Sequence, residues 1–101
     1  MTIKIQPTDG KGTPPGKLAD AELHFNDGPL EGLKLIGFSI WERKTGSGRN
    51  VTFPARSYAV NGERRSYAML RPMVDSTAQT RLRDQILEAY AELTGTLEAT
   101  A

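Results

Sequence analysis

The alternation of apolar and polar residues is clearest between Leu18 and Phe25. Apolar residues there are spaced two apart, and the residues between them are polar or charged. This period is typical of a β-strand with one face in a core and the other in water. A shorter alternation over Thr2–Gln6 predicts another strand. The positions of the longer segment expected to face the core are Ala19, Ala21, Leu23 and Phe25.

A second apolar segment, Leu33–Trp41, has apolar residues at both odd and even positions. Two apolar faces are typical of the interior of a sheet, so we expect a central strand covered on both sides by helix, loop or a partner. Val51–Phe53 predicts a short strand that stops at Pro54, because proline has no N–H to donate to a ladder. One face of the central strand is predicted to hold Leu33, Leu35, Gly37, Ser39 and Trp41, and the other Lys34, Ile36, Phe38 and Ile40.

Asn61 and Gly62 form the strongest hairpin signal in the chain. Both residue types tolerate the positive φ that a type I′ turn requires. They are flanked by Tyr58–Val60 and Arg65–Tyr67, which predict the paired strands. Other turns or loops are predicted where Gly, Pro and Asn are dense. These segments are Pro7–Gly16, Asn26–Pro29 and Thr45–Gly48.

A C-terminal helix is predicted from residue 76 onward. Ser76 is followed three residues later by Gln79, which is the spacing of a capping box, and Asp75 adds negative charge at the same end. Apolar residues recur every three or four positions and form one stripe. Gly95 is predicted to end the helix as its C′ residue. The stripe consists of Leu82, Ile86, Ala89, Tyr90 and Leu93, with Leu87 to one side of it.

Strands followed by a helix predict an α+β fold. We expect an antiparallel sheet of four to five strands with the helix packed on it. Residues 1–16 are predicted to be a short strand and a Pro/Gly-rich loop, residues 17–94 a single α+β domain, and residues 95–101 a flexible tail. A small sheet with open edges also predicts a homodimer, in which a second copy closes an edge.

Composition narrows the class of protein. The chain has 101 residues, a net charge of +1 and no cysteine, which excludes disulfides and thiolate chemistry. It has no apolar run near the 18 residues that a membrane span needs, and no signal-peptide pattern follows Met1. A cytoplasmic location without membrane association is therefore expected.

The sequence offers little support for catalysis. The single histidine, His24, lies on the polar side of its strand without an obvious partner, which is typical of a surface residue. No nucleophile elbow, acidic metal-binding loop or phosphate-binding loop is present. We therefore expect neither an enzyme nor a cofactor, metal or small-molecule substrate.

The charges are unevenly distributed. Residues 42–72 contain seven basic residues and two acidic ones, and six of the seven are arginine. Arginine suits phosphate, and the interleaved Tyr58 and Tyr67 suit stacking on unpaired bases, so this block indicates nucleic-acid binding. An equally weighted alternative is a solvated face that protects a strand edge from aggregation. Trp41 and Phe53 are predicted to be core residues. The block consists of Arg43, Lys44, Arg49, Arg56, Arg64, Arg65 and Arg71.

From about Lys17 to Leu93, the order of these motifs resembles the SpoVG family (stage V sporulation protein G), a group of small bacterial regulators. The resemblance rests on a strand pair broken by a Gly turn, a corner at Val51–Arg56, a Gly62-Glu63 hairpin and a strand ending in Pro72. Its closest match is the helix, with Ser76-Thr77 followed by Arg81–Tyr90.

The resemblance implies a dimeric DNA- or RNA-binding regulator with an antiparallel sheet and a C-terminal helix. It implies contacts from Arg56, after the Pro corner, and from Arg81, near the helix start. The alternative is a protein–protein interaction module that does not bind nucleic acid. The predicted nucleic-acid-binding residues are Arg43, Lys44, Arg49, Arg56, Arg64, Arg65 and Arg81.

Overall fold

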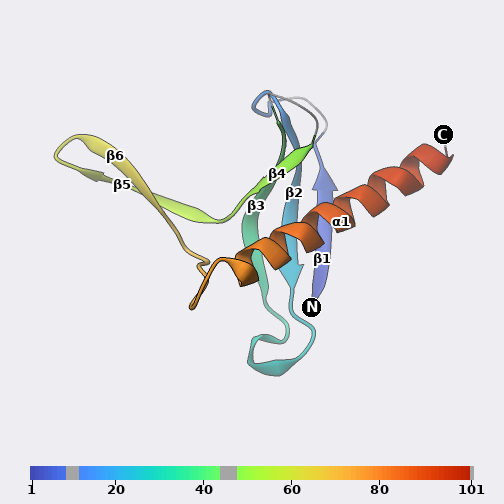
Figure 1. Cartoon of the computed structure of the whole chain (residues 1–101), viewed down its shortest axis with the longest axis horizontal. Coiled ribbons are helices and arrows are strands. Elements are labelled where there is room, and N and C mark those ends of the chain that lie inside the picture. Colours follow the sequence, from blue (N-terminus) through green and yellow to red (C-terminus); the bar gives the residue numbers. More distant parts are fainter. Residues whose placement is uncertain (9–11, 44–47, 101) are drawn as a thin grey trace.

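The computed structural model describes residues 1–8, 12–43 and 48–100 and shows an α+β fold. A four-stranded antiparallel sheet has the order β1-β2-β3-β4, and the strands follow one another in the sequence. This sheet, with one C-terminal helix packed on it, confirms the predicted fold class (Figure 1). The strands are β1 (Thr2–Pro7), β2 (Lys17–His24), β3 (Lys34–Glu42) and β4 (Arg49–Thr52), with a 3₁₀ turn at Gly28–Leu30 between β2 and β3.

The helix α1 (Thr77–Thr100) begins where the capping signals predict. The carbonyl of Ser76 accepts a hydrogen bond from the Thr80 N–H, and the carboxylate of Asp75 accepts one from the Thr77 N–H, both at 2.9 Å. The hydrogen bonds that the side chain and the backbone N–H of Thr77 donate to Asp75 hold the pKa of this carboxyl below its usual value. The helix does not end at Gly95 as predicted but continues to Thr100.

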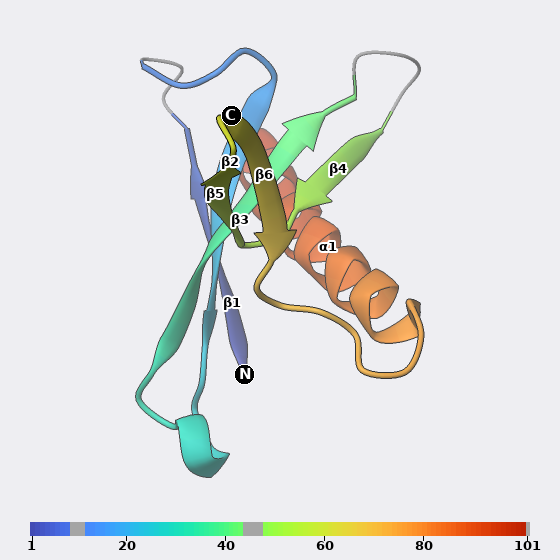
Figure 2. The same cartoon turned by 90° about the vertical axis from the view of Figure 1, so that its left-hand side faces the viewer.

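The core lies between α1 and one face of the sheet, as Figure 2 shows from the side. The apolar stripe of α1 faces this core, and Ile86 is fully buried. The alternation in β2 is also confirmed, because its predicted core residues line the same layer. The buried residues are Ala19, Ala21, Leu23, Phe38, Ile40, Val51, Ile86 and Tyr90.

Strand β3 is interior to the sheet, as predicted, but its faces differ from the simple alternation. Ala21 pairs with Phe38 and Leu23 pairs with Leu35, so β3 holds one extra residue between these two positions. This bulge turns Leu35 toward the core and leaves Ile36 58% exposed. The prediction that Ile36 shares a face with Phe38 is therefore wrong. In the described part of the chain, α1 covers the face of β3 that holds Phe38 and Ile40.

The remaining strands, β5 (Ala55–Val60) and β6 (Glu63–Ala68), form a separate two-stranded sheet. We call this hairpin the arm. Figure 1 shows that it extends away from the sheet and the helix. The radius of gyration is 15.3 Å, whereas a compact chain of this length has about 13 Å. The arm therefore lies outside the core.

No helix in the described parts of the chain combines the length and the apolar character that crossing a membrane requires.

Candidate nucleic-acid interface

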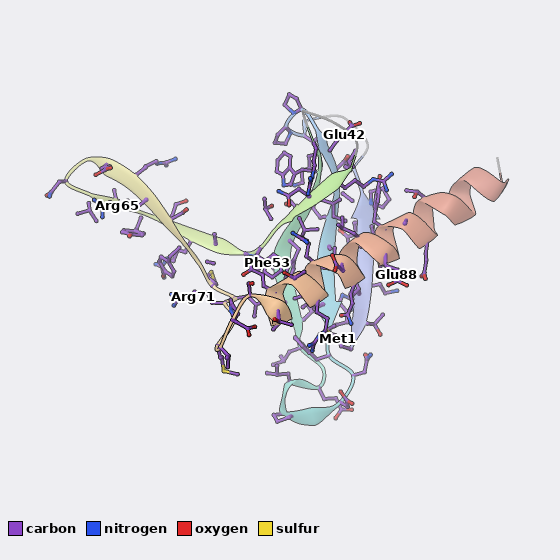
Figure 3. The ribbon with its side chains drawn as sticks, in the orientation of Figure 1. Met1, Glu42, Phe53, Arg65, Arg71 and Glu88 are labelled. Carbon is purple, nitrogen blue, oxygen red and sulfur yellow. The ribbon has the colours of Figure 1, made fainter. Side chains whose placement is uncertain are left out.

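The predicted basic residues occupy three separate places in the fold. Arg56, Arg64 and Arg65 lie on the arm, and Figure 3 shows Arg65 far from the helix. Arg43 and Arg49 lie at the end of the β3–β4 pair, and Arg81 lies in α1. Lys44 lies outside the residues that the structure describes. The basic block of the sequence is thus not one continuous surface, and the arm holds its largest group.

The arm has the turn that its sequence predicts. Asn61 and Gly62 have φ values of 52° and 77°, the positive values that a type I′ turn requires. The register places Val60 opposite Glu63, which confirms a two-residue loop. The turn therefore determines which arm residues face each other across the hairpin.

One face of the arm combines arginine and tyrosine. Arg56 pairs with Tyr67 and Tyr58 pairs with Arg65, so the two residue types alternate along and across the strands. Paired residues, and residues two apart in a strand, project from the same side. We call these four residues the Tyr/Arg face. The opposite face consists of Ala55, Ser57, Ala59, Arg64, Ser66 and Ala68.

The two tyrosine rings of the Tyr/Arg face lie close together and remain accessible. The ring centroids of Tyr58 and Tyr67 are 5.7 Å apart with an interplanar angle of 55°. The residues are 41% and 42% exposed. The rings therefore support each other on one side and leave aromatic surface open to solvent.

The charges of the arm are only partly neutralised. Arg65 Nη2 lies 3.2 Å from Glu63 Oε2, and both side chains are exposed. Within the described residues, no ion pair is found for Arg56 or Arg64. An exposed pair contributes little to stability and exchanges readily with other anions. The arm therefore offers three guanidinium groups to a polyanion.

The side chain of Arg49 packs on a core residue instead of extending freely into solvent. Its guanidinium carbon lies 4.8 Å from the centroid of the Tyr90 ring, which is buried in α1. This cation–π contact links β4 to the helix. The structure therefore gives the predicted contact residue Arg49 a packing role.

Trp41 is not in the core, contrary to prediction. The prediction for Phe53 is confirmed, because its ring packs edge-on against the core ring of Phe38 with centroids 5.2 Å apart. Trp41 is half-buried and its Nε1 donates a hydrogen bond to Thr52 Oγ1 at 2.9 Å. It borders a surface hollow with Arg43. The apolar pattern of β3 could not reveal that Trp41 lies outside the core, because the pattern shows which residues are apolar but not which face of the strand the helix covers.

Two further arginines lie outside the arm. Arg81 is exposed in the second turn of α1. Arg71, which Figure 3 places where the chain passes from the arm to α1, borders a small apolar cavity of about 140 Å³ beside Phe53 and Leu82. Neither residue belongs to the Tyr/Arg face.

His24 has a partner that the sequence did not indicate. Its Nε2 lies 3.0 Å from Glu22 Oε1, and Lys34 Nζ lies 3.4 Å from the same oxygen. The hydrogen bond from His24, followed by the contact with Lys34, holds the pKa of Glu22 below its usual value. Among the described residues, no group of three or more His, Asp or Glu side chains could hold a metal ion.

Comparison of the chain with protein-family models, with curated proteins and with solved structures finds no match.

Proposed function

We propose that this protein is a nucleic-acid-binding regulator that resembles the SpoVG family and acts as a dimer. The observation that carries the proposal is the Tyr/Arg face of the arm. It presents two arginines and two accessible tyrosines on one side of a hairpin that projects from the body. The arm accounts for three of the seven predicted contact residues.

The chemistry of the Tyr/Arg face matches that of a nucleic acid strand. Guanidinium groups neutralise phosphates and release their counterions, which supplies much of the affinity of such complexes. Aromatic rings stack on unpaired bases regardless of sequence. Each strand of the arm has six residues, which corresponds to a length of about 20 Å. The arm is therefore long enough to contact several nucleotides.

The exposure of the arm also supports a dimer. Every residue of β5 is exposed, and so is every residue of β6 except Ala68. An isolated two-stranded hairpin is marginally stable in water. A second copy packed against the arm would cover part of this surface, and a second copy along the free edge of β1 or β4 would pair an open strand edge. Sedimentation equilibrium measures the mass directly, and a monomer at all concentrations would contradict this part of the proposal.

Fluorescence anisotropy of labelled single-stranded and duplex oligonucleotides tests the proposed function. Replacing Arg56, Arg64 and Arg65 with alanine should weaken binding without unfolding the domain, because these side chains lie outside the core. On a single strand, each lost phosphate contact reduces the magnitude of the negative slope of log K against log salt by about 0.7. Losing the two arginines of the Tyr/Arg face therefore reduces it by about 1.4, and losing a contact from Arg64, on the opposite face, brings the reduction to about 2. The charge-matched control replaces Lys4, Lys34 and Arg83, which lie on the body.

The two triple variants separate the proposal from its alternative. Equal affinity of wild type and the arm variant for every oligonucleotide would contradict nucleic-acid binding by the arm. Equal losses in the arm variant and the body variant would show an effect of net charge only. A protein–protein interaction module predicts that no oligonucleotide binds and that partner capture tolerates high salt.

A further inference from the structure

A second candidate contact lies at the far end of the sheet, where β3 ends. A surface hollow of about 470 Å³ opens there, a volume within the range of pockets that bind small ligands. Figure 3 shows Glu42 at the end of the sheet remote from Met1. The hollow is lined by Pro15, Gly16, Trp41, Glu42 and Arg43.

The walls of this hollow are held in position by hydrogen bonds. The Trp41 Nε1 bond to Thr52 orients the indole ring. The Glu42 N–H donates to the Gly16 carbonyl at 2.8 Å, and the Arg43 N–H donates to the Gly48 carbonyl at 3.2 Å. Because both sides of the hollow are tied together, its shape does not depend on a ligand to assemble it. A preorganised site loses less entropy on binding.

The hollow combines two kinds of chemistry. Trp41 supplies an aromatic surface and Arg43 supplies a guanidinium. An aromatic surface suits the face of a nucleobase, and a guanidinium suits phosphate. The side chain of Glu42 projects to the opposite face of the sheet from Trp41, because neighbouring residues of a strand alternate between its faces. Within the described residues, no ion pair is found for Arg43.

We infer that this hollow binds one unpaired base of a single-stranded nucleic acid. The base stacks on Trp41, and the adjoining phosphate contacts Arg43. This inference rests on the proposed function and gives the protein a base-binding pocket separate from the arm. The pocket selects single strands, because a base within a duplex cannot leave its stack without a cost in unpairing.

Trp41 is the sole tryptophan of the chain, so its fluorescence reports on the hollow alone. The wild-type protein is titrated with unlabelled 12-mers of deoxycytidine and of cytidine, and binding is followed in parallel by anisotropy of labelled 12-mers. Quenching of Trp41 should saturate at the same concentration as the anisotropy. Quenching by only one of the two 12-mers would identify DNA or RNA as the source of the base.

Two outcomes of the titration have separate meanings. If anisotropy shows binding while Trp41 fluorescence stays unchanged, the hollow is not a base pocket and the proposed function stands. If no 12-mer binds at all, both proposals fail. A proline-rich peptide that quenches Trp41 when the 12-mers do not would also overturn the inference, since proline packs on indole as well.

Substitutions in the hollow test the individual contacts. Trp41→Leu keeps an apolar side chain but removes the stacking surface, and should weaken binding about tenfold. Arg43→Ala keeps the fluorophore and should raise the concentration needed for quenching, whereas the control Lys4→Ala, on β1, should change it less. Equal effects of these two variants would exclude a phosphate contact at Arg43.

Discussion

Replacing Gly37 with alanine should destabilise the protein through two separate costs. Gly37 lies at the bulge of β3 with a φ of 109°, a conformation that residues with a Cβ rarely adopt. Holding such a residue there costs roughly 1–3 kcal/mol. A Cβ on Gly37 would also lie 3.1 Å from Pro54 Cβ, which is closer than ordinary van der Waals contact.

Pro54 cannot easily move away from such a Cβ. Its ring is rigid, and its carbonyl accepts a hydrogen bond from the Met69 N–H at 2.9 Å. Forcing extra volume into such a contact costs about 1–3 kcal/mol. The two costs together predict a loss of about 2–6 kcal/mol, which is a large part of the roughly 5–15 kcal/mol that stabilises a typical domain.

Gly32 provides a matched control, because its φ is 87° and a Cβ built on it has no atom within 4 Å. Gly32→Ala therefore incurs the backbone cost without the contact. Urea unfolding followed by Trp41 fluorescence measures the free energy of unfolding of both variants, and equal m values show that the unfolded states are comparable. Gly37→Ala should be less stable than Gly32→Ala by about 1–3 kcal/mol, the cost of the contact alone. Equal losses would refute the role of Pro54.

Three further predictions concern the core, the open face of the sheet and the arm. Ile86→Ala should lower the free energy of unfolding by about 2–5 kcal/mol because Ile86 is fully buried, whereas exposed Glu88→Ala should change it by less than about 0.5 kcal/mol in the same urea experiment. The pKa of Glu22 is lowered mainly by its hydrogen bond from His24, so the contacts of ionised Glu22 stabilise the fold above the usual value of 4.5 and are lost as the pH falls through the lowered pKa. The difference in free energy of unfolding between wild type and Glu22→Gln should therefore shrink on acidification. A difference that stays constant from neutral pH to about pH 2, roughly the range in which carboxylates titrate, would contradict this assignment. Gly62→Ala, at a φ of 77°, should cost about 1–2 kcal/mol within the arm alone, so amide exchange should accelerate about fivefold or more over β5 and β6 and stay unchanged in the body.

The separation of the arm from the core makes function and stability independently testable. The arm contributes no residue to the buried core. Substitutions of Arg56 or Tyr58 therefore remove candidate contacts without opening a cavity. Substitution of Arg49 does not have this advantage, because its guanidinium packs on the buried ring of Tyr90. A loss of binding in an Arg49 variant would combine both effects.

Local patterns in the sequence determine the elements of this fold. The period-2 alternation predicts β2, because each strand residue points to the side opposite its neighbour. The helical spacing from Leu82 to Leu93 predicts the face of α1 that packs on the sheet. Asn61 and Gly62 predict the hairpin turn, because both tolerate positive φ. Each of these signals depends on residues within a few positions of one another.

Tertiary contacts determine how these elements are used. The bulge at Gly37 exchanges the environments of Leu35 and Ile36, because it depends on the register between β2 and β3. The hairpin leaves the main sheet instead of extending it, and Trp41 lies on the face that the helix does not cover. The basic block is a property of the sequence alone. Only the fold places Arg56, Arg64 and Arg65 on a projecting arm while Arg43 and Arg49 lie at the end of the β3–β4 pair, because β5 and β6 leave the main sheet.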